Sequence, residues 1–105
     1  MIRGDICLHT FKEPDKRRPV LILTRTNAIS FLNDVTVAPI TSTVRDNGSS
    51  VWLDESDGMK QVCAVSLDHI RTVPKGKLSG PIAHLSDLKM VEVLEAIKFA
   101  FGFDN

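Results

Sequence analysis

Over the first three quarters of the chain, hydrophobic residues fall into short runs, and polar or turn-forming residues follow each run. Such spacing is typical of strands in a small barrel or sandwich. The early connections are too short for the crossover helices that parallel strands need. One helical turn fits the stretch "TNAISFLND". The runs that we predict to be strands span residues 6–8, 20–23, 35–42, 50–54, 62–66 and 69–73.

The end of the chain changes to the period of a helix, which we predict over residues 87–101. Ser86 suits the N-cap, Asp87 suits the positive end of the helix dipole, and Gly102 suits the C-cap. The apolar face is wide for a helix on one small sheet, so the helix is interpreted either as a core helix or as one that also packs on a partner subunit. Its two apolar stripes are Leu88, Val91, Leu94, Ile97 and Phe101, and Met90, Val93, Ile97 and Ala100.

Length and charge narrow the class of protein. The 105 residues are predicted to form one domain, residues 1–105, with one modest core. Lys plus Arg and Asp plus Glu number 13 each, which argues against an indiscriminate nucleic-acid binder but permits a local basic site. We expect no membrane span and no signal peptide, hence a cytoplasmic protein. Cys7 and Cys63 lie within apolar segments and are predicted to be small buried thiols.

Basic residues are concentrated just before the second predicted strand. Lys12, Lys16, Arg17 and Arg18 fall within seven positions. Such a run often forms only a solvated loop, and that interpretation stays open. However, Pro19 fixes its own φ and holds Arg18 in an extended backbone, so the guanidinium starts from a defined point. An always-charged group with five donors suits a phosphate whose charge grows in a transition state.

Hydroxyl groups end the third predicted strand, at Thr41, Ser42 and Thr43. They either terminate the strand or present donors and acceptors to a ligand beside Arg18. The three histidines do not stand at metal-ligand spacing to one another or to cysteine. The sequence also has no Gly-rich phosphate loop and no nucleophile elbow. We therefore predict neither a metal nor a cofactor.

Several segments together resemble the MazF/PemK-type toxins of type II toxin–antitoxin systems. They are "RGDI" at 3–6, "RRPVLIL" at 17–23, "VTVAPITS" at 35–42 and "VSLDHIRTV" at 65–73, followed by "GPIAHLS" and the closing helix. The resemblance covers nearly the whole chain, and "RPVLIL" followed by "APITS" is its most specific part. It implies a mainly β fold, namely a small SH3-like β-barrel with a C-terminal α-helix, and a homodimer.

The resemblance further implies a metal-independent endoribonuclease that cuts single-stranded RNA at short sequences and is inhibited by a cognate antitoxin. The RNA's own 2′-hydroxyl would attack the phosphorus, giving a 2′,3′-cyclic phosphate and a 5′-hydroxyl. The family's arginine before proline corresponds to Arg18 and its threonine after isoleucine to Thr41, the expected catalytic pair. The residues predicted to bind substrate are Lys12, Lys16, Arg17, Ser42, Thr43 and His9, the last also a candidate general base.

Two departures from the family pattern limit this inference. The stretch between "LHT" and Arg18 lacks the glycines common in the family's first loop, so the cleavage sequence is not carried over. Cys7 stands where an aromatic residue is frequent. The alternatives are a non-catalytic toxin or interaction module of related barrel fold, such as a gyrase-poisoning protein, and a homologue that has lost activity.

Overall fold

The computed structural model describes residues 1–10, 17–43 and 47–104. These residues form a mainly β fold that ends in a helix, as predicted. The helices are α1 (Thr26–Ile29) and α2 (Asp87–Phe101), with single 3₁₀ turns η1 (Glu55–Asp57), η2 (Leu67–His69) and η3 (Lys75–Lys77). The strands are β1 (Asp5–Thr10), β2 (Arg17–Ile22), β3 (Asp34–Thr41), β4 (Ser50–Leu53), β5 (Cys63–Ser66), β6 (Arg71–Pro74) and β7 (Leu78–His84).

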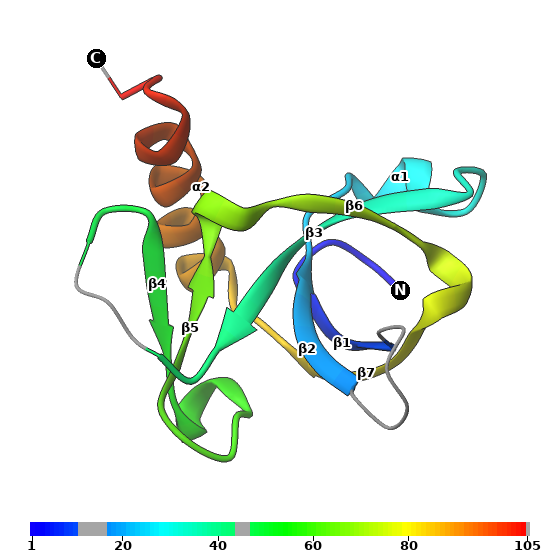
Figure 1. The fold of residues 1–105 in the computed structure, drawn as a ribbon, viewed down its shortest axis with the longest axis horizontal. Helices are drawn as coiled ribbons and strands as arrows, with labels where there is room; N and C mark the ends of the chain where they lie inside the picture. Colours follow the sequence, from blue (N-terminus) through cyan, green and yellow to red (C-terminus); the bar gives the residue numbers. More distant parts are fainter. Residues whose placement is uncertain (11–16, 44–46, 105) are drawn as a thin grey trace.

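The strands form one antiparallel sheet in the order β4-β5-β3-β2-β1-β7, and β6 pairs with β3. Strand β3 organises this sheet, because it pairs with β6 at its beginning, with β2 in its middle and with β5 at its end. Figure 1 shows β1, β2, β3, β6 and β7 curving around a common centre, while β4 and β5 lie beside α2. The predicted barrel-like fold with a C-terminal helix is therefore confirmed.

Both faces of the central strands are buried, which explains the unbroken apolar run in β2. Along this strand Leu21 belongs to one hydrophobic cluster, whereas Val20 and Ile22 belong to another. The first cluster includes Val93 of α2 and lies between the sheet and this helix. The second joins residues of β1, β2, β3 and β6 to Ile29 of α1. A strand buried on both faces reads as continuously apolar rather than alternating.

The predicted cysteine environment is confirmed. Cys7 and Cys63 are free and buried, one in each hydrophobic cluster. Burial raises the pKa of both thiols, and nearby aspartates raise it further. A protonated buried thiol behaves as a small apolar group and is inert as a nucleophile.

Strand β7 was not predicted, because Gly80 and Pro81 lie in its middle and these residues normally signal a turn. It pairs with β1 on one side, and the register shifts between Ile6 and Leu8. Gly80 has φ +111°, a backbone conformation that side chains rarely permit. Most of β7 is exposed, so it lacks the hydrophobic alternation that marks a strand in sequence.

Helix α2 has the predicted bounds and caps. Ser86 Oγ accepts a hydrogen bond from the Lys89 backbone N–H at 3.1 Å, and Gly102 ends the helix with φ +76°. Val93 is fully buried between the helix and the sheet, but Leu88 and Val91 are 81% and 57% exposed. One apolar stripe of α2 thus packs on the core, whereas most residues of the second stripe point outward. Within the described ranges, no helix has the length and apolar character to cross a membrane.

Candidate active site

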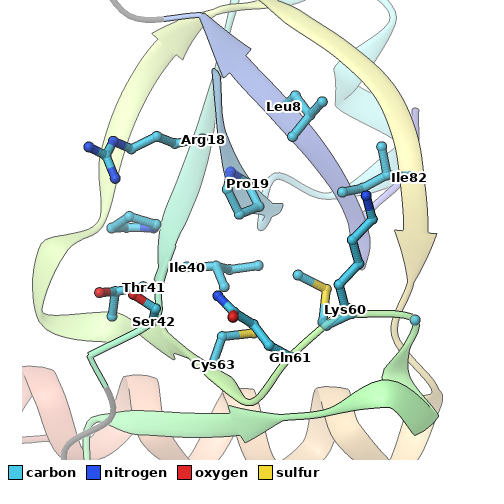
Figure 2. Close-up of a pocket in the computed structure, with 13 residues that line it drawn as sticks. Leu8, Arg18, Pro19, Ile40, Thr41, Ser42, Lys60, Gln61, Cys63 and Ile82 are labelled. Carbon is cyan, nitrogen blue, oxygen red and sulfur yellow. The ribbon is translucent and has the colours of Figure 1, made fainter. Parts of the chain in front are cut away.

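A groove of about 960 Å³ opens where the ends of β2 and β3 meet the segment between η1 and β5. Figure 2 shows its side chains arranged around an open centre. Residues from five parts of the chain contribute, so the fold rather than any local segment creates the groove. Its lining residues are Leu8, Arg18, Pro19, Pro39, Ile40, Thr41, Ser42, Gly58, Met59, Lys60, Gln61, Cys63 and Ile82.

The structure brings Arg18 and Thr41 together in this groove. Strands β2 and β3 are antiparallel, with Val20 opposite Pro39. This is the last pair of the two strands, and Arg18 and Thr41 each lie two residues beyond it. In Figure 2 the two side chains lie on the same side of the groove, and Ser42 is next to Thr41. The two residues singled out in the sequence, 23 positions apart, thus line the same groove.

The Thr41 hydroxyl is held in a turn at the end of β3. Its Oγ1 accepts a hydrogen bond from the Thr43 backbone N–H at 3.1 Å. A hydroxyl has one proton to donate in addition to its acceptor sites, so Thr41 keeps a donor for a ligand. Thr41 is half-buried, Ser42 and Thr43 are exposed, and Thr43 does not line the groove.

The four predicted basic residues have different positions. Arg18 lines the groove and is exposed. Arg17 begins β2, opposite Thr10 of β1; it is exposed and does not line the groove. Lys12 and Lys16 lie outside the described residues. Of the two predicted basic residues that the structure describes, Arg18 shares the groove with Thr41 and Ser42.

His9 is buried in β1, opposite Arg18 in the β1–β2 register. Its neighbour Leu8 lines the groove, whereas His9 is not among the lining residues. Burial lowers the pKa of His9, and the positive charges of Arg71 and Lys77 lower it further. The structure does not bring this imidazole into the groove, so its role as a base stays a prediction.

The other two histidines make contacts that join nearby elements. His84 Nδ1 lies 2.8 Å from Asp5 Oδ1, which links β7 to β1. His69 Nδ1 lies 2.7 Å from Ser66 Oγ, just after β5. Among the described residues, no group of three or more His, Cys, Asp or Glu is arranged to hold a metal ion.

Sequence reasoning missed Lys60 and Gln61, which line the groove opposite Arg18. Both are exposed and follow the η1 turn, a stretch interpreted only as turn-forming. Lys60 and Arg18 are both cations, and the described lining includes no acidic side chain. A chain of zero net charge thus has a local basic groove, which suits an anionic ligand.

Comparison with known proteins agrees with the resemblance seen in the sequence. A sequence model of the family described as "PemK-like, MazF-like toxin of type II toxin-antitoxin system" matches residues 2–101. Endoribonuclease MazF3 of Mycobacterium tuberculosis is 43% identical over 90 residues, covering 86% of this chain and 87% of the relative. Probable endoribonuclease MazF5 of the same species is 36% identical over 85 residues, covering 80% and 78%.

Solved structures give the same result. Mycobacterium tuberculosis toxin MazF-mt6 superposes with a TM-score of 0.87 at 40% identity, covering 96% of this chain and 99% of that one. An endoribonuclease from a mycobacterial species, solved in complex with its cognate antitoxin, has the same fold at 22% identity, with a TM-score of 0.87 and coverage of 100% and 98%. On the family match and the identity to MazF3, this chain belongs to the PemK-like, MazF-like toxins of type II toxin–antitoxin systems.

Proposed function

We propose that this chain is a toxin endoribonuclease that cleaves single-stranded RNA at short specific sequences without a metal ion. The observation that carries the proposal is the shared groove: Arg18 and Thr41 line it from paired strands, and its charged side chains are cations. The relatives named endoribonuclease support the reaction class. The proposal takes residues 1–105 as one toxin domain in the cytoplasm, which also suits the two free thiols.

The proposed reaction uses the RNA's own 2′-hydroxyl as the nucleophile. Its oxygen forms a bond to the adjacent phosphorus, and the bond from phosphorus to the 5′-oxygen breaks. The products are a 2′,3′-cyclic phosphate and a 5′-hydroxyl. Such a reaction needs a base for the 2′-hydroxyl proton, an acid for the leaving oxygen, and donors for the phosphorane oxygens.

Arg18 meets the need for donors. Its guanidinium stays protonated and presents several N–H groups in one plane, which matches the oxygens of a pentacoordinate phosphorus. Pro19 and the start of β2 fix its backbone, so little reorganisation is needed as charge develops. Thr41 forms a hydrogen bond to the scissile phosphate or the 2′-hydroxyl, and Ser42 supplements it. Arg17 binds RNA phosphate beside the groove.

The partners that we propose are a second copy of the chain and a cognate antitoxin. The exposed stripe of α2 offers an apolar surface for a two-fold dimer. An antitoxin segment that becomes ordered over the basic groove would exclude RNA, so antitoxin and RNA would compete. In two crystal structures of MazE-MazF from Deinococcus radiodurans, one chain has the same fold as this protein at 21% identity.

The test is incubation of RNA with purified protein in EDTA, followed by analysis of fragment ends. We expect cleavage that survives chelation, is lost in Arg18→Ala, and leaves cyclic phosphate ends. An RNA with one 2′-deoxy position at the cleavage point should bind and resist cleavage, since it lacks the nucleophile. Cleavage of this substrate would contradict the mechanism. An inert protein would favour the non-catalytic module or an inactive homologue, neither of which the named relatives favour.

A further inference from the structure

The groove has a second wall, formed by residues 58–61 between η1 and β5. In Figure 2, Lys60 and Ile82 lie across the groove from Arg18 and Thr41, and the Gln61 amide projects toward the centre. The groove volume of about 960 Å³ is at the upper end of the range of small-molecule sites. There is therefore room beyond the scissile phosphate for a neighbouring nucleotide.

The turn that carries this wall is fixed by its own hydrogen bonds. Asp54 accepts a hydrogen bond from the Ser56 backbone N–H at 2.9 Å, and the Asp54 N–H donates to Asp57 Oδ2 at 3.0 Å. The Asp54 side chain also accepts from the Asp57 backbone N–H, so that Asp54 and Asp57 form a reciprocal capping box. Gly58 then adopts φ +92°, and the Met59 N–H donates to the Asp54 carbonyl at 3.3 Å. Lys60 therefore follows a defined turn.

Helix α2 holds the same turn from outside. Lys89 Nζ lies 3.9 Å from Asp57 Oδ2, and it donates a hydrogen bond to the Trp52 carbonyl at 3.2 Å. Both side chains of the Lys89–Asp57 pair are largely buried, at 22% and 10% exposure. The wall is thus connected to the hydrophobic core, and side chains on a fixed backbone lose less entropy when they bind.

The chemistry of this wall matches a nucleotide. The Lys60 ammonium is a mobile point charge suited to a phosphate, and it needs no planar geometry. The Gln61 amide offers donors and an acceptor, the pattern that reads the edge of an unstacked base. Leu8, Ile40 and Ile82 supply apolar surface nearby for the face of a base.

We propose that Lys60 and Gln61 form a nucleotide-recognition subsite at the end of the groove opposite Arg18. Lys60 binds a backbone phosphate next to the scissile one. Gln61 hydrogen-bonds a base edge and sets one position of the cleavage sequence. This inference rests on the proposed endoribonuclease function, and it assigns part of the specificity to a rigid turn after η1.

The role of Gln61 is tested by mapping cleavage sites in a random-sequence single-stranded RNA pool. Gln61→Ala should lower the preference at one position of the cleavage sequence by roughly tenfold, because a lost base-edge contact removes discrimination there. The other positions should keep their preferences. Asn27→Ala, which removes an exposed amide of α1 outside the groove, is the matched control and should keep the wild-type profile. An unchanged profile in Gln61→Ala would overturn its assignment.

The role of Lys60 is tested through salt. Each phosphate contact to a single strand contributes roughly 0.7 to the slope of log affinity against log salt. Lys60→Ala should therefore raise KM, reduce this slope by about 0.7, and leave kcat nearly unchanged. Lys98→Ala removes an exposed lysine on α2 and should keep the wild-type slope. A wild-type salt slope in Lys60→Ala would overturn the assignment. Weaker binding of antitoxin by that variant would not rescue the assignment.

Binding of an oligonucleotide with a 2′-deoxy cleavage position separates this inference from the proposed function. Its affinity is measured by fluorescence anisotropy for the wild type, Lys60→Ala and Gln61→Ala. The subsite would be overturned if the wild-type protein cleaves RNA and both variants match it in cleavage-site preference and in oligonucleotide affinity. The endoribonuclease function would be unaffected by that result. Wild-type protein that binds without cleaving would overturn the proposed function, while weaker binding by Lys60→Ala would still support the subsite.

Discussion

The ammonium group of Lys89 in α2 donates a hydrogen bond to the backbone carbonyl of Trp52 in β4, with 3.2 Å between Nζ and the oxygen. The same ammonium lies near Asp57 of the η1 turn. One side chain therefore ties the C-terminal helix both to the sheet and to the turn that borders the groove.

Lys89→Met should lower the free energy of unfolding by about 1 kcal/mol. The substitution keeps most of the apolar stem and removes a hydrogen bond from a charged donor in a largely buried position. Urea unfolding measures the change through the midpoint. Lys98→Met is the control, because the Lys98 ammonium pairs with Glu95 on an exposed helix face. Its loss should change the free energy of unfolding by less than about 0.5 kcal/mol. Equal effects of the two variants would contradict the tethering role.

Arg18→Ala should reduce the cleavage rate by a factor on the order of 10²–10³, the usual loss when one preorganised transition-state donor is removed. Stability should change by less than about 0.5 kcal/mol, because the side chain is exposed. Arg18→Lys should restore part of the rate, since an ammonium keeps the charge but loses the planar geometry. The cleavage rates of the wild type, Arg18→Ala and Arg18→Lys are measured by single-turnover cleavage of a labelled RNA.

Arg17→Ala provides the comparison for Arg18. Arg17 is also exposed on β2 but does not line the groove, so its loss should raise KM more than it lowers kcat. Near-wild-type cleavage by both Arg18 variants, together with a large loss of kcat in Arg17→Ala, would move the catalytic assignment to Arg17.

The sequence predicted those parts of the fold that local patterns determine. The bounds of α2 follow from the cap preferences of Ser86 and Gly102 and from the helical period between them. Six of the seven strands were predicted with approximate bounds, because their apolar runs are separated by turn residues. Strand β7 is held by pairing with β1 and carries Gly80 and Pro81, so tertiary pairing outweighed its local signals.

The groove was predicted only in part, for a similar reason. Arg18 and Thr41 stand at the ends of apolar runs, and the family resemblance alone implied that they act as a pair. The strand register then places both near the last β2–β3 pair. Lys60 and Gln61 come from a turn whose local chemistry indicates a capping box and nothing about a ligand. Their place beside the groove depends on how η1 and α2 pack, which no short stretch of sequence specifies.

Stability should depend on pH through His9. Burial and the charges of Arg71 and Lys77 lower its pKa in the folded chain, and Arg18 lies across the strand pair. The unfolded chain, with a pKa of about 6.5 for this group, therefore binds more protons between the two pKa values. The contribution of His9 is fully present above about pH 6.5 and is lost as pH falls below it.

His9→Gln should flatten this dependence. The wild-type free energy of unfolding should fall more steeply between about pH 6.5 and 5 than that of the variant, by at most about 1.4 kcal/mol per pH unit for one proton. Urea unfolding at a series of pH values gives both slopes. His69→Gln is the control, since it removes an exposed imidazole. Parallel curves for wild type and His9→Gln would show that His9 is not responsible.

The exposed stripe of α2 should hold the dimer together. Val91 lies in it between Leu88 and Leu94, and all three side chains are exposed in the single chain. A contiguous apolar patch of this kind usually marks a protein interface. Val91→Glu would place a charge within a dry contact, so we expect the mass in solution to fall from two chains to one at micromolar concentration. Multi-angle light scattering measures that mass.

Unfolding would not explain such a loss of mass, because glutamate has a higher helix propensity than valine and position 91 faces outward. Circular dichroism should therefore show an unchanged helix content. Glu95→Gln, on the polar face of the same helix, should remain dimeric. If the groove of one subunit needs the other to hold RNA, the Val91→Glu monomer should also bind the deoxy-substituted oligonucleotide more weakly. A monomeric wild-type protein that cleaves RNA at full rate would reject the dimeric RNA site, while the assignments of Arg18 and Thr41 would be unaffected.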